Sequence, residues 1–318
     1  MSIASEGRVV VLAGGLSPER DVSLRSGRRV ADALRVTGVD VGVLDVDANL
    51  MANLAAQPPA CVVPLLHGGP GEDGAIRDVL VALGLPFVGS GPSACRRAFD
   101  KPIASSLVGA AGVAVPSSMA LPHATFRELG AAAVLDAVVA RLGLPLMVKP
   151  TRGGSSLGAT VVRSAADLPS AMVAAYAYGD IALIESFVHG TEVAVSVVED
   201  AAGARALPVV EVVPDGGFYD YGARYTAGAT EFVTPARLSD DVLAACAETA
   251  LTVHRVLGLR DWSRSDLIVD AAGVPWYLEV NVAPGMTETS TYPQAVLAAG
   301  LDLGAVTASL VDLAITRG

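Results

Sequence analysis

The sequence predicts a mixed α/β fold divided into several domains, and three observations carry this prediction. The chain has 318 residues, more than the roughly 250–300 over which a single core usually extends. Of these residues 52% are hydrophobic and 17% are charged, a composition that can build real cores. Over residues 1–98, short β-branched apolar runs alternate with helical periodicity, which is typical of a parallel sheet covered by helices.

We expect an N-terminal α/β domain over residues 1–98, a central α+β unit over 99–187 and a C-terminal unit over 188–318. In the first, strands are expected at 8–13, 39–44, 60–66 and 86–89, because each is a short apolar run bounded by turn residues. Helices are expected through Val30 and Leu34 and over 76–83.

The other two units mix helices with antiparallel strands. The central unit is predicted to contain helices 104–111, 131–142 and 165–176 and strands 115–119, 146–149, 159–162 and 182–187. The C-terminal unit is predicted to contain strands 192–198 and 206–213, helix 240–257, a hairpin of 265–269 with 275–280, and a helix from Leu301. Residues 217–230 have no periodicity, and loops of that length are commonly lids or disordered segments.

Composition excludes several classes of protein. A net charge of -11 argues against a nucleic-acid partner, because neutralising phosphates needs surplus Lys and Arg. The three cysteines, Cys61, Cys95 and Cys246, form no CxxC, which fits a reducing compartment and excludes a thiolate zinc site. No apolar run reaches the roughly 18 residues of a membrane span, and residues 1–7 have no signal-peptide core. We therefore expect a cytoplasmic protein with no membrane partner.

Two glycine-rich turns are candidate ligand sites. The segment KPTRGGSSLG (149–158) offers backbone N–H groups, the hydroxyls of Ser155 and Ser156, and the cation of Lys149. Both of its flanks are predicted strands, so it is a hairpin tip that either covers a triphosphate or is an ordinary Gly/Ser turn. The earlier turn AGGLSPE places Glu19 near a strand end, where it either meets a cationic ligand group or simply favours a helix start.

The hairpin SRSDLIVDAAGVPWYLEVNVAPG (263–285) is the sharpest chemical signal. Its turn centres near Ala272, so Asp266 lies across from about Glu279, and Asn281 shares a face with Glu279. Two carboxylates and an amide oxygen suit Mg²⁺, whereas the alternative is a solvated polar edge. Arg264 is either an ion-pair partner or a fork for a substrate carboxylate. The N–H of Gly285 is placed to stabilise an oxyanion.

At this point the chain resembles the D-alanine–D-alanine ligase family of the ATP-grasp superfamily. The resemblance covers nearly the whole chain, through collinear motifs that end at the carboxylate hairpin. These are GGLSPERDVSLRSG (14–27), LHGGPGEDGAIRDVL (66–80), GLPFVGSGPSAC (84–95) with DK at 100–101, GLPLMVKPTRGGSSLG (143–158), FYDYGARYTAG (218–228) and LEVNVAPGMTETS (278–290).

The resemblance implies a three-domain ATP-grasp fold that binds ATP between the central and C-terminal domains, with two Mg²⁺ ions (Mn²⁺ is an alternative) and a homodimeric assembly. The residues it assigns to the nucleotide are Lys101, Lys149, Ser156, Glu185, Phe187, Val188, Glu192 and Arg224, and to the metal Asp266, Glu279 and Asn281. Those it assigns to catalysis are Glu19, Ser155, Tyr225, Arg264 and Gly285, and to the amino acid substrates His67, Ser290, Thr291 and Tyr292.

The implied reaction joins two D-alanines, for peptidoglycan precursors, through an acyl phosphate. The chain departs from the family pattern at Arg224, where the family usually has lysine, and at Ser186, where it usually has a charged residue. It departs again at Thr291-Tyr292, which follow Ser290 where the family has aliphatic residues. A specialised paralogue with another amino or hydroxy acid acceptor is therefore the alternative. A silent nucleotide-binding module and an NAD-dependent dehydrogenase fit the motifs less well.

Overall fold

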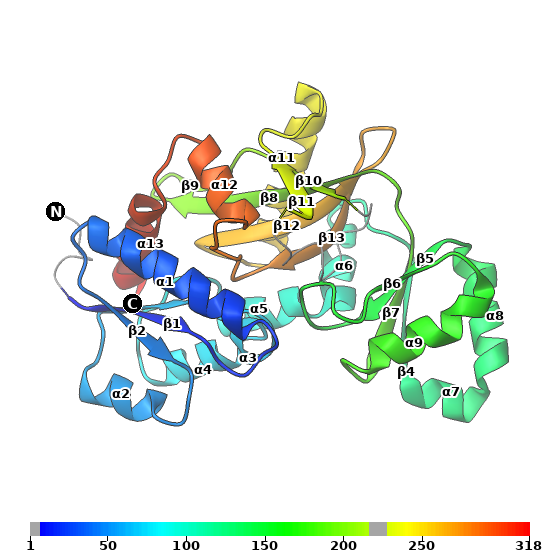
Figure 1. Ribbon diagram of the computed structural model, residues 1–318, viewed down its shortest axis with the longest axis horizontal. Coiled ribbons are helices and arrows are strands. Elements are labelled where there is room, and N and C mark those ends of the chain that lie inside the picture. The colour runs from blue at the N-terminus through cyan, green and yellow to red at the C-terminus, as the bar shows by residue number, and fades with distance from the viewer. Residues whose placement is uncertain (1–6, 216–227) are drawn as a thin grey trace.

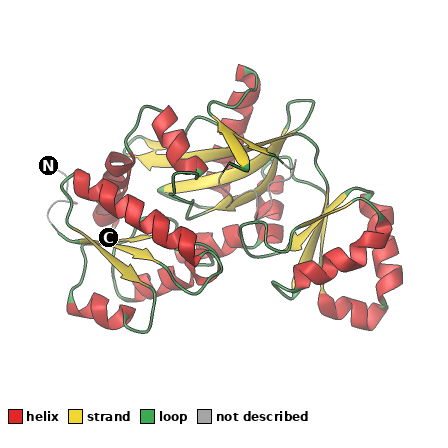
Figure 2. Cartoon of the chain, in the orientation of Figure 1, coloured by secondary structure: helices red, strands yellow, loops and turns green. Residues whose placement is uncertain are grey.

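The computed structural model describes residues 7–215 and 228–318 of the chain, and this part contains three sheets (Figures 1 and 2). The first is parallel, in the order β2-β1-β3. Its strands are β1 (Val9–Ala13), β2 (Val41–Asp45) and β3 (Cys61–Pro64). The helices that accompany it are α1 (Arg20–Val36), α2 (Leu50–Ala56), α3 (Gly69–Glu72) and α4 (Ala75–Ala82). Helices α5 (Pro92–Phe99) and α6 (Lys101–Ala110) follow, and their buried residues pack in the core of the third sheet. The predicted N-terminal parallel sheet is thus confirmed.

The second sheet is antiparallel, in the order β4-β7-β5-β6. Its strands are β4 (Ser118–Pro122), β5 (Leu146–Pro150), β6 (Thr160–Val162) and β7 (Ile181–Ser186). Helices α7 (His123–Leu129), α8 (Ala131–Leu142) and α9 (Leu168–Tyr176) pack against it, with a 3₁₀ turn at Ala165–Asp167. Because β5 and β6 pair antiparallel, the glycine loop between them is a hairpin tip, as its flanking strands predict.

The third sheet has the order β11-β10-β8-β12-β13, with β9 paired to β8. Its strands are β8 (Thr191–Asp200), β9 (Gly203–Ala206), β10 (Val210–Pro214), β11 (Thr230–Val233), β12 (Trp262–Val269) and β13 (Pro275–Asn281). The helices of this part are α11 (Asp240–Val256), α12 (Thr291–Ala298) and α13 (Leu303–Arg317). Alternate residues of β8 are buried on both faces, between α11 on one side and α12 with α13 on the other.

The last helix belongs to the core of the first sheet as much as to the third. Val306 and Leu310 of α13 share one hydrophobic cluster with Val9 and Val11 of β1 and with Trp262 of β12. Figure 1 shows α13 beside α1, next to the first sheet. The C-terminal helix α13 therefore packs between the N-terminal parallel sheet and the sheet that carries the carboxylate hairpin.

Several expected elements differ. The strand predicted at 86–89 is reduced to one parallel bridge between Val62 and Phe87, because Pro86 has no N–H and Gly89 donates its N–H to the Asp261 side chain. The strand predicted at 206–213 is two strands, β9 and β10. Helices α2, α3, α5, α7 and α12 were not expected. The predicted lid at 217–230 lies mostly outside the described residues, and its last residue begins β11.

In the described ranges no single helix has both the length and the apolar character of a membrane span; α12 and α13 meet that test only as a pair bent by 100°.

Candidate functional site

Two adjoining cavities lie where the three sheets meet. The larger cavity, of about 470 Å³, lies between the second and third sheets. The smaller cavity, of about 190 Å³, lies between the third sheet and the N-terminal end of α1. Glu192, Asp266 and Glu279 line both cavities, so one acidic wall separates them. A ligand in one cavity therefore meets a ligand in the other across these carboxylates.

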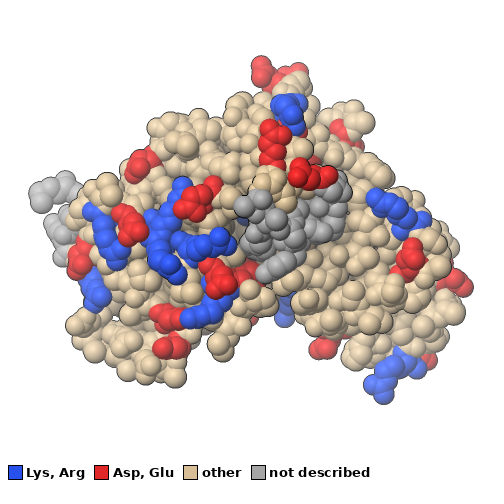
Figure 3. Space-filling view, viewed as in Figure 1, with Lys and Arg blue, Asp and Glu red and all other residues tan. Residues whose placement is uncertain are grey.

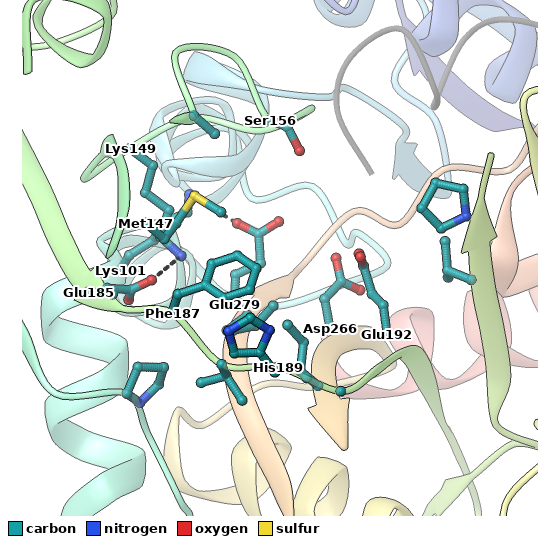
Figure 4. A pocket seen from close by; sticks show the side chains of 18 of the residues that line it. Lys101, Met147, Lys149, Ser156, Glu185, Phe187, His189, Glu192, Asp266 and Glu279 are labelled. Atoms are coloured by element: carbon teal, nitrogen blue, oxygen red, sulfur yellow. Dashed lines mark ion pairs between the residues drawn. The ribbon is translucent and has the colours of Figure 1, made fainter. Parts of the chain in front are cut away.

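Two lysines reach into the larger cavity, and each is held by a carboxylate. Lys149, on β5, lies 2.7 Å from Glu185 on β7, and Lys101, the first residue of α6, lies 3.1 Å from Glu279 (Figure 4). Lys101 also donates to the carbonyl of Gly153 in the glycine loop, at 2.6 Å. Burial acts to lower the pKa of Lys149, but the charges of Glu185 and Glu279 outweigh it, so this pKa is raised and the ammonium stays charged.

One side of the larger cavity is apolar. Met147, Phe187 and Val188 line it, and the Phe187 ring stands edge-on to the His189 ring with 4.8 Å between centroids. Figure 4 shows Phe187 and His189 beneath Met147. A flat apolar ring system fits between such groups. The Glu185 side chain points to Lys149. On this side of the cavity a ligand ring would therefore contact backbone and apolar groups rather than the Glu185 carboxylate.

The carboxylate hairpin has the predicted register. Asp266 of β12 stands opposite Glu279 of β13, and Arg264 stands opposite Asn281. The Nε and Nη2 groups of Arg264 donate to the two carboxylate oxygens of Asp266, each at 2.7 Å. A β-bulge follows Asp266, where the pairing shifts to place Leu267 opposite Tyr277. The bulge changes the direction of the strand next to the acidic wall, which is common for bulges near ligand sites.

The donor set fits a phosphate-bound divalent cation rather than an all-protein metal cage. Within residues 7–215 and 228–318 no three or more His, Cys, Asp or Glu side chains gather as metal ligands. Asp266 and Glu279 with Asn281 supply two carboxylates and an amide oxygen. Mg²⁺ commonly binds through one or two carboxylates plus substrate phosphates, so these three residues fit it once a phosphate enters the larger cavity.

Two consecutive serines of the glycine loop face different cavities. Ser155 lines the smaller cavity and Ser156 lines the larger. Their φ angles are 55° and 56°, a left-handed conformation that non-glycine residues rarely adopt. Such strain is commonly kept at ligand sites. The loop thus presents one hydroxyl to each ligand space.

Glu19 is enclosed by two glycines at the start of α1. A Cβ added to Gly68 would lie 2.4 Å from one Glu19 oxygen, and one added to Gly154 would lie 3.2 Å from the other. The carboxylate is 5% exposed, so it rests between the backbone of the first sheet's loop and that of the glycine loop. Side chains at either glycine would displace this carboxylate, which fixes it at the edge of the smaller cavity.

His67 is a neutral link between α1 and the segment after β13. Its Nδ1 lies 3.0 Å from the carbonyl of Ala283, which only accepts, so Nδ1 carries the proton. Its Nε2 then accepts from Ser26 Oγ at 3.1 Å, and Ser26 Oγ itself accepts from the N–H of Met286. Burial lowers the pKa of His67 to about 4, so the ring is uncharged at neutral pH.

The loop after β13 brings Gly285 against Ser290. A Cβ on Gly285 would stand 2.7 Å from Ser290 Oγ, so a side chain there would displace that hydroxyl. Ser290 Oγ accepts from the Thr287 N–H at 3.1 Å and lies 2.9 Å from Thr287 Oγ1. Gly285, Ser290 and Thr291 all line the smaller cavity.

Comparison with known proteins places this geometry in a family. The family model for the D-ala D-ala ligase C-terminus matches residues 107–312. The D-alanine–D-alanine ligase of Bordetella petrii is 41% identical over 311 residues, which cover 98% of this chain and 93% of that protein. The chain belongs to the D-alanine–D-alanine ligase family. The ligase of Moorella thermoacetica is 38% identical over 308 residues, covering 97% of this chain and 99% of that protein.

Solved structures agree with this assignment. The VanG D-Ala:D-Ser ligase from Enterococcus faecalis has a TM-score of 0.83 and 26% identity, and covers 96% of this chain and 99% of its own. The D-alanine–D-alanine ligase from Bacillus anthracis has a TM-score of 0.81 and 26% identity, covering 98% and 97%. The ATP-grasp resemblance inferred from the motifs is thereby confirmed.

One expected substrate residue of this family member lies away from the cavity. Tyr292 is fully buried in the core, with its ring centroid 6.0 Å from that of Trp262, and it does not line either cavity. The expectation that Tyr292 forms part of the substrate wall is therefore corrected. The reason is helix α12, which begins at Thr291 and turns consecutive side chains about 100° apart. Thr291 faces the smaller cavity, whereas Tyr292 faces the core.

The remaining predicted residues divide into two groups. Arg224 and Tyr225 lie outside the described residues. All the other predicted residues line one of the two cavities, apart from Tyr292. Four lining residues were not predicted: Arg25 and Glu72 in the smaller cavity, and Met147 and His189 in the larger. Arg25, Glu72 and Met147 stand within quoted motifs (14–27, 66–80 and 143–158), so those motifs were the available signal, whereas His189 lies outside every quoted motif.

Proposed function

We propose that this protein is an ATP-dependent D-alanine–D-alanine ligase that makes the dipeptide of peptidoglycan precursors through an acyl phosphate. The observation that carries the proposal is the acidic wall shared by two cavities, one with two buried lysines and one with Glu19 and Arg264. Phosphoryl transfer needs the two bound substrates to lie next to each other. Ligands in these two cavities would do so at the carboxylates that line both. ATP would occupy the larger cavity and the two amino acids the smaller.

The protein groups around the phosphates supply charge and position. Lys101 and Lys149 neutralise phosphate oxygens, and the glycine loop offers Ser156 and backbone N–H groups to them. Phe187 and Val188 border the space for the base, and Glu192 stands on the wall toward the ribose. Asp266, Glu279 and Asn281 would hold Mg²⁺, which when bound neutralises the charge that develops on the transferring phosphoryl group.

In the smaller cavity Glu19 would hold the ammonium of the first D-alanine, so that its carboxylate faces the shared wall. That carboxylate attacks the γ-phosphorus of ATP, the bond to the bridging oxygen breaks, and ADP leaves with an acyl phosphate formed. The free amine of the second D-alanine then attacks the acyl carbon, and inorganic phosphate leaves. Arg264 and the N–H of Gly285 are placed to stabilise the oxyanion of the tetrahedral intermediate.

A specialised acceptor is the second candidate, and Thr291 favours it. Its Oγ1 is buried and has no hydrogen-bond partner among the described residues, although Thr291 lines the smaller cavity. A buried unpaired hydroxyl is costly, and a polar acceptor would satisfy it. The structural relative from Enterococcus faecalis is a D-Ala:D-Ser ligase. D-serine or a hydroxy acid is therefore the acceptor to compare with D-alanine.

The test is phosphate release from Mg-ATP with D-alanine, with L-alanine, with D-alanine plus D-serine, and with no amino acid, the products being identified by mass spectrometry. Release that requires D-alanine and yields the D-alanyl-D-alanine mass supports the main proposal. A mixed product formed in preference to it supports the second candidate. Release without any amino acid, and without dipeptide, contradicts both.

The organisation of the chain is part of the same proposal. We place three domains at 1–98, 99–187 and 188–318, in an ATP-grasp arrangement, and a homodimer in the cytoplasm. Limited proteolysis tests the boundaries, because cuts should fall near residues 98 and 187. Light scattering in solution tests the dimer, for which a single-chain mass would be the contrary result.

A further inference from the structure

We propose that one water molecule is bound beside Gly89 by the side chains of Arg77 and Trp262, and that it fixes the carbonyl of Val282 behind the substrate end of the site. Arg77 lies on α4, Trp262 is the first residue of β12, and Val282 directly follows β13. The inference rests on the proposed function and gives a role to side chains that its steps do not use.

Arg77 is a cation in the interior of the protein. Figure 3 shows basic side chains at the surface beside acidic ones over α1, whereas the side chain of Arg77 is fully buried. Its Nη1 donates to the carbonyl of Gly71, but its Nε and Nη2 have no hydrogen-bond partner among the described residues. Leaving buried N–H groups of a guanidinium without partners is costly, so an acceptor oxygen is expected at this group.

Trp262 supplies a second buried donor. Its side chain is fully buried, and within residues 7–215 and 228–318 its Nε1 also has no hydrogen-bond partner. The indole ring is held in place by the ring of Tyr292, which stands edge-on to it with 6.0 Å between centroids. Buried indole N–H groups usually find a partner, so the same expectation applies to Trp262 as to Arg77.

The two donors meet at Gly89, where the backbone leaves a space. Gly89 has a φ of 103°, which favours glycine. A Cβ built on it would lie 3.5 Å from Trp262 Nε1, 3.8 Å from Arg77 Nη2 and 4.0 Å from the carbonyl oxygen of Val282, which are its nearest atoms beyond the chain neighbours. A space of about the size of a methyl group is therefore bordered by two donors and one acceptor.

This combination of groups matches a water molecule. Water accepts from Arg77 Nη2 and Trp262 Nε1 and donates to the carbonyl of Val282, which gives the roughly three hydrogen bonds that buried waters commonly make. An anion fits less well. It would be repelled by the Val282 carbonyl oxygen and by the carboxylate of Asp261, which accepts from the N–H of Gly89 at 2.6 Å.

The water would fix the segment that leads from β13 into the smaller cavity. The carbonyl of Ala283, the next residue after Val282, lies 3.0 Å from Nδ1 of His67. With the water in place, two consecutive carbonyls of this segment are bonded to groups outside it. Gly285 follows two residues later, and its N–H is the one placed for the oxyanion in the proposed reaction. The two side chains that hold the water are therefore positioning residues.

The first test detects the water by NMR on the isotope-labelled full chain. The chain has two tryptophans, and Trp276→Phe, which removes an Nε1 that donates to Asp270, leaves the Trp262 indole signal alone. We expect a dipolar cross-peak between this indole proton and water, and its loss in Gly89→Ala, whose methyl group fills the space. A wild type without the cross-peak, or a Gly89→Ala variant that keeps it, would overturn the inference. If Gly89→Ala does not fold, the wild-type spectrum decides.

Steady-state kinetics of Trp262→Phe measure the consequence, with Trp276→Phe as the matched control. Phenylalanine keeps an aromatic ring and removes the donor. We expect kcat for dipeptide formation to fall about 3- to 10-fold, because the segment that carries Gly285 loses one of its two ties. The KM for ATP should stay at the wild-type value, since neither Trp262 nor Arg77 lines the larger cavity. A kcat equal to that of the control contradicts the positioning role. If the wild type makes no dipeptide, the proposed function fails, and the NMR result still decides whether the water is bound.

Discussion

Glu72 is an ionisable residue buried beneath the substrate end of the site. It accepts a hydrogen bond from the N–H of Gly68 at 2.7 Å and is 6% exposed. Burial raises the pKa of Glu72 to about 7, the hydrogen bond from Gly68 opposes this, and the charge of Glu19 adds to it. The carboxyl therefore changes its charge near neutral pH, beside the residue expected to hold the first ammonium.

This titration predicts a pH dependence of stability. The ordinary pKa is 4.5 and the folded value is about 7, so the folded protein retains a proton that the unfolded chain has released. The stabilisation is complete below pH 4.5 and is lost as the pH rises to about 7. Glu72→Gln removes this dependence, so its free energy of unfolding relative to wild type should rise by about 3 kcal/mol between pH 4.5 and 8.

Urea unfolding of both proteins at several pH values measures the difference. Comparing wild type with Glu72→Gln cancels His67, whose lowered pKa acts with the opposite sign and adds stability as the pH rises from about 4 to 6.5. Parallel curves for the two proteins would show that Glu72 has an ordinary pKa in the folded state.

Glu279 joins the lysine side of the site to the metal side, because it pairs with Lys101 and stands opposite Asp266. Glu279→Gln keeps the shape but removes a charge, and losing several kcal/mol of transition-state stabilisation lowers Mg-ATP turnover on the order of 100-fold or more. The far-ultraviolet circular dichroism should be unchanged. Glu248→Gln, at an exposed position on α11, serves as control. Activity near that of the control would remove Glu279 from the metal set.

At the scale of an element, α12 decides which side chains meet the substrate. Ser290 stands at its N-cap, Thr291 faces the smaller cavity, and Tyr292 packs on Trp262. The Tyr292 hydroxyl has no partner in the described part of the chain, and burial raises its pKa. The two neighbours on this helix therefore have separate roles, one toward ligand and one toward core.

Substitutions on α12 should separate these roles. Thr291→Val should lower the ratio of D-serine to D-alanine incorporation by about 2- to 10-fold, because it removes the hydroxyl available to a polar acceptor. Tyr292→Leu should leave that ratio unchanged and lower the free energy of unfolding by about 2–4 kcal/mol. Competition assays and urea unfolding measure the two effects. A changed ratio in Tyr292→Leu, or an unchanged one in Thr291→Val, would contradict this division.

At the scale of the whole molecule, Asp261 ties three distant parts together. It is fully buried with a φ of 67°, and its carboxylate accepts from Arg317 at 2.8 and 2.9 Å and from the N–H of Gly89 at 2.6 Å. Its own N–H donates to Glu199. The end of the first sheet, the start of β12 and the last turn of α13 thus meet at one carboxylate, three residues before Arg264.

Removing the partner of this buried charge should be costly. Arg317→Gln should lower the free energy of unfolding by about 3 kcal/mol, because breaking a buried pair leaves an uncompensated charge. Arg35→Gln, which removes an exposed pair with Asp32, should cost less than about 0.5 kcal/mol. Urea unfolding compares them. The double variant Asp261→Asn/Arg317→Gln should recover part of the loss, and full additivity of the two changes would argue against the pairing.

Much of the fold and of the site was predictable from short stretches of sequence. The register of Asp266 with Glu279 was predictable because the turn at Asp270–Gly273 sets the count on both strands. The glycine loop was predictable as a hairpin tip because β5 and β6 are short apolar runs on either side of it. The parallel sheet followed from alternation of strand and helix.

Other features depend on packing between elements far apart in the sequence. The position of Tyr292 in the core was not predicted, because a short helix, α12, was not recognised after Ser290. The strand predicted at 86–89 failed because the N–H of Gly89 donates to the side chain of Asp261, which directly precedes β12. No local pattern indicates that α13 packs against β1, or that Glu19 lies between Gly68 and Gly154.

The sequence by itself determined which chemical groups are present and their order within each hairpin and loop, because periodicity and turn residues act over a few residues. Only the tertiary structure decided that Lys101 pairs with Glu279, that one acidic wall divides two cavities, and that Glu19 lies between Gly68 and Gly154. Those relations join separate sheets, and their distances are set by how the hydrophobic cores pack.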